Sequence, residues 1–148
     1  MSTLMQRLSV FAAALWWGSL STLGFLVVPL LFMHLATPAI AGSMAATLFG
    51  VQTWVSLGCG VLLIFFLKPK SHSPQSSSVQ TSWFKSAFFF VIIGVLLAAL
   101  NEFAVSPRIV ARENLKLWHG VGSAMYLVQW ICSAIVLWKL AVKSKNST

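Results

Sequence analysis

The sequence has little charge, and very little acidic charge. Only 8% of its 148 residues are charged, and only two, Glu102 and Glu113, are acidic, whereas 58% are hydrophobic. About a quarter of the residues of a soluble domain are charged, so this scarcity excludes an ordinary soluble domain. The composition predicts a chain that lies in a membrane.

The chain also lacks the local motifs of the common enzyme classes. It contains no phosphate-binding loop, dinucleotide fingerprint, HExxH, nucleophile elbow or CxxC. We therefore find no argument for an enzyme. The net charge of +8 comes from basic residues at the ends of apolar runs. Because these residues form no folded basic face for phosphates, we expect the lipid bilayer as partner and no nucleic acid.

Four long apolar segments make up most of the chain. We expect helices at about 8–33, 44–67, 85–112 and 115–138, each near or above the roughly 20 residues that cross about 30 Å of hydrocarbon. The Ser-rich segment 68–82 predicts a mobile, solvated link. We see a single transmembrane domain over 1–148 and no sequence repeat. The expected fold class is an all-α membrane protein, an antiparallel four-helix transmembrane bundle.

The basic residues predict the orientation of this bundle. Lys and Arg accumulate on the cytoplasmic side of a membrane. With four spans, one side holds both termini and the Ser-rich link, and seven of the ten basic residues fall there: Arg7, Lys68, Lys70, Lys85, Lys139, Lys143 and Lys145. The opposite side holds Arg108, Arg112 and Lys116. We predict cytoplasmic termini in a multi-pass protein of a cell inner membrane.

The stretch NEFAVSPRIVARENLKLWHG at 101–120 gathers both carboxylates with several basic residues. A turn at Ser106-Pro107 would follow the usual chemistry of a helix start, but a turn at Glu113-Asn114 gives two helices of similar length. We favour the second position. Glu102 then lies inside the bundle, in line with small residues, and we expect its nearest polar neighbour on the last helix to be Ser123, Tyr126 or His119.

Polar groups inside a membrane are costly unless paired, so they are candidates for function. A carboxylate near arginines suits the handling of a proton or cation. The predicted polar cluster near the outer surface comprises Glu102, Arg108, Arg112, His119, Ser123, Tyr126 and His34. We interpret it as a small-ligand or cation binding or translocation site. The alternative for each polar residue is a hydrogen bond that only locks helices together.

Two other functions stay open at this stage. His34 and His119, with deep tryptophans at 16, 17, 54 and 130, suit a haem- or quinone-handling redox protein, and haem is the cofactor considered. Two histidines without a third ligand or fixed spacing define no metal site. Small residues four apart on every helix equally suit a homo-oligomer or a structural partner of a larger membrane complex.

Three segments together carry a family resemblance: VVPLLFMHLATPAIAGSMAATLFG at 27–50, NEFAVSPRIVAR at 101–112 and LWHGVGSAMYL at 117–127. They resemble the four-helix family called domain of unknown function 4149, or transmembrane-protein-205-like. The matching residues are Pro29, Phe32, Gly42, Asn101, Pro107, Arg108, Arg112, His119 and Ser123. The resemblance covers nearly the whole chain apart from the Ser-rich link and the tail. It implies a multi-pass membrane protein and supplies no established reaction.

Overall fold

The computed structural model describes residues 3–67 and 78–145 of the chain. Its helical segments are α1 (Thr3–Thr22), the π-helix η1 (Leu23–Val27), α2 (Val28–His34), α3 (Pro38–Phe66), α4 (Ser78–Leu100), the π-helix η2 (Asn101–Val105), α5 (Ser106–Val110) and α6 (Leu115–Lys145). Segments that follow one another without a break form continuous helices. The first helix is therefore α1-η1-α2, the second α3, the third α4-η2-α5 and the fourth α6.

Each of these four helices is long and apolar enough to cross a membrane. The candidate spans are Leu4–His34, Pro38–Phe66, Lys85–Val110 and Leu115–Val142. All exceed the roughly 20 residues that a span needs. Of the predicted Ser-rich link, residues 68–77 lie outside the described part, and residues 78–82 already belong to α4.

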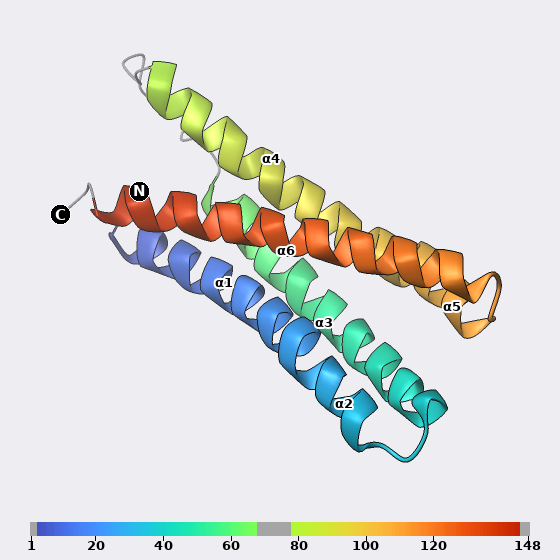
Figure 1. Cartoon of the computed structure of the whole chain (residues 1–148). Helices are drawn as coiled ribbons and strands as arrows, with labels where there is room; N and C mark the ends of the chain where they lie inside the picture. Colours follow the sequence, from blue (N-terminus) through green and yellow to red (C-terminus); the bar gives the residue numbers. More distant parts are fainter. Residues whose placement is uncertain (1–2, 68–77, 146–148) are drawn as a thin grey trace.

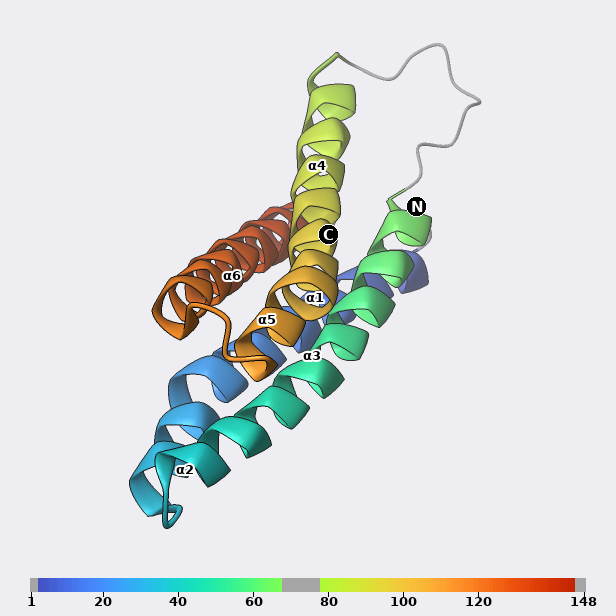
Figure 2. The ribbon, with the colours of Figure 1, turned by 90° about the vertical axis from the view of Figure 1, so that its right-hand side faces the viewer.

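The four helices are arranged as two hairpins. The second helix runs back beside the first, and the fourth beside the third (Figure 1). The hairpins pack mainly through α1 against α6 and through α3 against α4. Two views show that the hairpins diverge toward their short turns (Figure 1, Figure 2).

Both short turns follow from local sequence chemistry. The Thr37 side chain accepts a hydrogen bond from the backbone N–H of Ile40, and Pro38 opens α3, which is the preferred chemistry of a helix start. Residues 111–114 separate α5 from α6, with positive φ at Arg112 (55°) and Asn114 (37°). The turn therefore lies at the later of the two positions considered, and Pro107 lies within the third helix.

The two π-helices precede the two prolines inside the bundle. In η1 the N–H of Val28 bonds the carbonyl of Leu23, and in η2 the N–H of Ser106 bonds the carbonyl of Asn101. A proline within an α-helix lacks its N–H and collides with the carbonyl four residues earlier. A wider turn directly before the proline takes up this conflict. Each π turn adds a residue and rotates the following side chains by about 100°.

The core is apolar at the end of the bundle that holds Thr3. Trp16, Leu20, Leu63, Val91 and Val136 are fully buried there, packed with the small residues Ala13 and Ala87. Large apolar side chains such as Phe11 and Phe65 are exposed on the outside of the helices, as expected for a surface that faces lipid. This apolar core holds the four helices together at one end of the bundle, and the polar groups described below lie nearer the other end.

Candidate functional site

Glu102 lies half-buried in η2, the π turn of the third helix. Its carboxylate faces Gly50 of α3, because a Cβ built on Gly50 would lie 3.4 Å from Glu102 Oε1. Among the described residues it makes no hydrogen bond or ion pair. A carboxylate without a partner inside an apolar span is costly, so it is the strongest single candidate for function.

The carboxylate of Glu102 lies against the second helix. That its nearest polar neighbour on the fourth helix is Ser123, Tyr126 or His119 stays a prediction. Asn101, the preceding residue, faces α6, because its Oδ1 would lie 3.2 Å from a Cβ on Gly122.

Tyr126 fills the other π turn. Its hydroxyl donates a hydrogen bond of 2.8 Å to the carbonyl of Leu20, three residues before the start of η1, and the backbone N–H of Gly24 faces the tyrosine oxygen. Its ring lies against Gly24, where an added Cβ would be only 2.7 Å from Cε1. In an α-helix Leu20 and Gly24 would bond each other, so the tyrosine hydroxyl is inserted into the backbone ladder.

A second polar group lies at the centre of the bundle, and we call it the polar layer: Ser19, Gln52, Ser56 and Gln129. Gln52 Nε2 donates to Ser19 Oγ at 2.9 Å and to Ser56 Oγ at 3.4 Å, and Gln129 Nε2 donates to Ser56 Oγ at 3.0 Å. Both glutamines and Ser56 are buried. The polar layer therefore joins the first, second and fourth helices.

The seven predicted site residues do not form one cluster. Ser123 and His119 are exposed on α6, and Arg112 is exposed in the turn. The exposed Arg108 donates to the carbonyl of Ala104, and its guanidinium lies 4.6 Å from the centre of the Trp118 ring. Of the seven, Glu102 and Tyr126 reach other helices: Glu102 faces Gly50 of α3, and Tyr126 contacts Phe49 of α3 and the backbone of the first helix.

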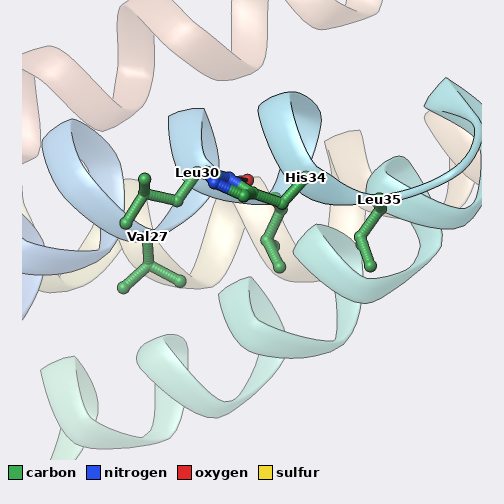
Figure 3. Close-up of a pocket in the computed structure, with 5 residues that line it drawn as sticks. Val27, Leu30, His34 and Leu35 are labelled. Carbon is green, nitrogen blue, oxygen red and sulfur yellow. Dashed lines mark hydrogen bonds between the residues drawn. The ribbon is translucent and has the colours of Figure 1, made fainter.

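His34 ends α2 beside a shallow apolar groove. The groove is lined by Val27, Leu30, Leu31, His34 and Leu35 (Figure 3), and His34 Nδ1 lies 3.0 Å from the carbonyl of Leu30. His119 lies on the other hairpin, near the start of α6. Since the hairpins diverge toward these ends (Figure 1), the fold gives no support to a bis-histidine haem site. The described ranges contain no group of three metal-ligating side chains.

The deep tryptophans fill space rather than line a cavity. Trp16 is fully buried against Gly94, while Trp130 stacks near Trp17 with ring centres 6.1 Å apart and donates to Ser21 Oγ. Trp54 is exposed. The arrangement therefore offers no slot for the flat ligand considered above.

The two hairpins resemble each other, which the sequence analysis missed. Helices 1 and 3 match at a shift of 78 residues: η1 aligns with η2, and Phe25, Val27 and Pro29 align with Phe103, Val105 and Pro107. Helices 2 and 4 match at a shift of 77: Val51, Gln52 and Ser56 align with Val128, Gln129 and Ser133. The likeness is limited to these few positions, and the expectation of no sequence repeat over the whole chain stays a prediction.

Burial and contacts follow the same repeat. Leu20 and its equivalent Ala98 are both buried, as are Leu63 and Leu140. Equivalent residues also contact each other: Trp16 lies against Gly94, and the rings of Phe49 and Tyr126 lie 5.2 Å apart, edge to face. Contact between equivalent residues is what a twofold axis between two copies produces. The polar layer lies where the two copies meet.

Sequence reasoning overlooked Gln129, Asn101 and Gly50 as site residues. Gln129 was detectable, since an amide in the middle of a span is costly by itself and the spacing of Gln52 and Ser56 recurs at Gln129 and Ser133. The roles of Asn101 and Gly50 depend on the π turn. No spacing rule for an ordinary α-helix would have found them.

The chain was compared with known proteins once this geometry was established. The model of the family described as domain of unknown function (DUF4149) matches residues 11–117. No curated protein and no solved structure matches the chain. The matched segment covers most of the first helix, the second and third helices, both π turns, Glu102 and the turn before α6, which is well over half of the sequence. The chain therefore belongs to the DUF4149 family.

Proposed function

We propose that the chain is a membrane module that binds a monovalent cation, a proton or an alkali ion, at Glu102. The observation that carries the proposal is the half-buried carboxylate in the π turn η2, which no described residue pairs or hydrogen-bonds. A bound cation removes the cost of that negative charge, because an unpaired charge is expensive in an apolar medium. The proposal involves no catalysed reaction.

The surroundings of Glu102 suit a small ion better than a large ligand. Gly50 leaves room beside the carboxylate of Glu102. Oxygen ligands are those that hard cations prefer. No other acidic side chain lies in the third helix, since the only other one is Glu113 in the following turn.

The proposal includes an orientation. The chain crosses a cell inner membrane four times as an antiparallel bundle with both termini in the cytoplasm, because seven of its ten basic residues then lie inside. Glu102 is then nearer the outer surface. Single cysteines at Ser76 and Thr148 test this with a membrane-impermeant maleimide. We expect labelling only after the cells are opened, and labelling in intact cells would reject the orientation.

The binding proposal is tested by carboxyl modification in lipid vesicles. Dicyclohexylcarbodiimide enters lipid and modifies carboxyl groups that hold a proton in apolar surroundings. The full chain in phosphatidylcholine vesicles is treated with the reagent, and the modification of Glu102 and Glu113 is followed by mass spectrometry. Because Glu113 is exposed in the turn, it is the internal control. We expect faster modification of Glu102.

Added salts then identify the ion. Slower modification of Glu102 in sodium or potassium chloride than in choline chloride indicates an alkali ion, whereas equal rates in all three indicate a proton. The Glu102→Gln variant must lose the modification while Glu113 keeps its own rate. Modification of Glu113 as fast as that of Glu102 would overturn the proposal.

A further inference from the structure

The side chain of Arg108 turns back toward the middle of its own helix. Arg108 lies two residues before Val110, where the third candidate span ends. Its guanidinium donates a hydrogen bond to the carbonyl of Ala104, one helical turn nearer the middle of the span. Arginines near the ends of membrane helices usually extend toward water instead. The positive charge of Arg108 therefore lies on the lipid side of its own Cα.

Trp118 of α6 holds the guanidinium at that depth. Its ring is half-buried, and Cζ of Arg108 lies over it at 4.6 Å from the ring centre. An indole face attracts a cation, and tryptophan is common at the level of the lipid headgroups. Backbone bonds order the turn between the two residues, because the N–H of Glu113 donates to the carbonyl of Arg108 at 3.1 Å and the N–H of Trp118 donates to that of Asn114 at 3.2 Å.

No carboxylate of the chain balances the positive charges around this pair. We call the surface the basic turn: Arg108, Arg112, Lys116 and Trp118. The three cations are exposed, and none of them forms an ion pair with Glu113 in the same turn or with any other residue that the structure describes. A charge at the edge of the apolar layer is costly without a counter-charge. The basic turn therefore presents positive charge to an anion from outside the chain.

Large apolar side chains surround these cations. Val110 follows Arg108 by two residues, and Leu115 and Leu117 flank Lys116 on either side. All three apolar side chains are exposed. A free phosphate ion gains nothing from them, whereas a phospholipid brings a phosphate and acyl chains to the same place. The surroundings of the basic turn therefore suit a lipid headgroup better than a soluble anion.

The first hairpin lacks this combination of side chains. At the shifts of 78 and 77 residues, Arg108 corresponds to Leu30 and Trp118 to Ala41. Residues 35–42, which include the first short turn, contain no charged side chain. A hairpin of this kind therefore forms without cations at its turn, which favours a binding role for the basic turn over a role in folding.

We propose that the basic turn binds the headgroup of an anionic phospholipid, whose phosphate lies at Arg108 and whose acyl chains lie against the neighbouring apolar side chains. A guanidinium has five N–H groups, so the bond to the helix backbone leaves others for the phosphate, and such bonds are charge-assisted. Arg112 and Lys116 add attraction for the negative headgroup. The site does not include Glu102 and is independent of the ion binding proposed above.

Native mass spectrometry of lipid binding tests this site. The full chain in a mild detergent is titrated with phosphatidylglycerol or with phosphatidylcholine of the same acyl chains, and a third series adds inorganic phosphate as competitor. Arg108→Gln removes the ordered charge. Lys116→Gln removes an exposed charge that makes no described hydrogen bond, so its fold should be undisturbed. Arg7→Gln is the matched control, since Arg7 is exposed on α1, whose start lies at the opposite end of the bundle (Figure 1).

We expect the unaltered chain to bind phosphatidylglycerol more tightly than phosphatidylcholine. Arg108→Gln should weaken binding of phosphatidylglycerol about fivefold, the factor that one cation contributes near an anionic membrane surface. Lys116→Gln should weaken it less, Arg7→Gln should leave it unchanged, and inorganic phosphate should not displace the lipid. Equal affinity for the two lipids, equal losses in Arg7→Gln and Arg108→Gln, or unchanged affinity in both variants of the turn would overturn the proposal. Displacement of the lipid by inorganic phosphate would also overturn it, in favour of a site for a soluble anion.

Discussion

The two π turns occupy equivalent places in the two hairpins and are completed in opposite ways. In η1, Gly24 leaves room for Tyr126, whose hydroxyl bonds the backbone that the wide turn releases. In η2, Glu102 replaces the glycine, and the residue equivalent to Tyr126 is Phe49, which has no hydroxyl. The π turn η1 is therefore completed by a hydrogen bond from Tyr126, whereas the carboxylate of Glu102 in η2 has no partner among the described residues.

The two π turns therefore differ in how they are stabilised. A side chain from the neighbouring hairpin packs against the first turn and donates one hydrogen bond to its backbone. The second turn holds a carboxylate that only an ion or water completes. π turns often occur at functional sites, and we propose that role for η2 alone.

A glycine-to-alanine substitution should have unequal effects at Gly24, which lies in the first π turn, and at Gly50, which lies in α3 and faces the second π turn. A Cβ at Gly24 would lie 2.7 Å from Tyr126 Cε1, whereas a Cβ at Gly50 would lie 3.4 Å from the Glu102 carboxylate. We expect Gly24→Ala to lower the free energy of unfolding by about 1–3 kcal/mol through overpacking. Gly50→Ala should change it by less than about 0.5 kcal/mol. Unfolding in mixed detergent micelles measures both, and equal effects would contradict the comparison.

Removing the hydroxyl that closes the first turn should have a smaller effect. Tyr126→Phe leaves the carbonyl of Leu20 without its donor. Hydrogen bonds between membrane helices contribute on average about 0.6 kcal/mol and at most about 1.7 kcal/mol, and we expect a loss in that range. Ser133→Ala is the control, because Ser133 bonds only the backbone of its own helix. An equal loss of unfolding free energy in Tyr126→Phe and Ser133→Ala would show that the hydroxyl of Tyr126 does not stabilise the first π turn in particular.

Adding a hydroxyl to the second turn should alter chemistry more than stability. Phe49→Tyr gives the second hairpin the tyrosine of the first, next to Gly50 and therefore close to the Glu102 carboxylate. A donor to the charged form of a carboxylate favours that form. We expect slower carbodiimide modification of Glu102 with little change in unfolding free energy. Leu48→Met, on the same helix, is the control and should leave the modification rate of Glu102 unchanged. An unchanged rate in Phe49→Tyr would mean that residue 49 does not stand to the second turn as Tyr126 stands to the first.

The sequence predicted the parts of the fold that depend on length and local chemistry. Apolar length gives four helices that can span a membrane, and the balance of lengths puts the second short turn at 111–114. α-Helical spacing also predicted that Glu102 points into the bundle, where its carboxylate faces Gly50 of α3, but it did not predict the π turn that shifts the residues after Val105. The sequence analysis grouped His119, Ser123 and Tyr126 of α6 in one polar cluster, but Ser123 and His119 are exposed, whereas Gln129, outside that cluster, is buried.

The repeat was hard to see for a different reason. Residues that meet at a twofold axis must fit each other, so a large residue in one copy requires a small one in the other. Trp16 faces its equivalent Gly94, and Leu20 corresponds to Ala98. At such pairs the space is filled equally well, but the residue types of the two copies differ. Residue types are the same in both copies only around the π turns and the polar layer.

The central claim, that Glu102 is the site of an ion, is tested most directly by infrared spectroscopy of the two carboxyl groups one at a time. In Glu113→Gln, Glu102 is the only acidic side chain, and in Glu102→Gln only Glu113 remains; the double variant supplies the background. Spectra of each protein in lipid are recorded in choline, sodium and potassium chloride over a series of pH values. We predict that the Glu102 band responds to an alkali ion, or that its acid form absorbs at the higher wavenumber typical of apolar surroundings, whereas the Glu113 band does neither. Two carboxyl bands that behave alike in every salt and at every pH would contradict the account.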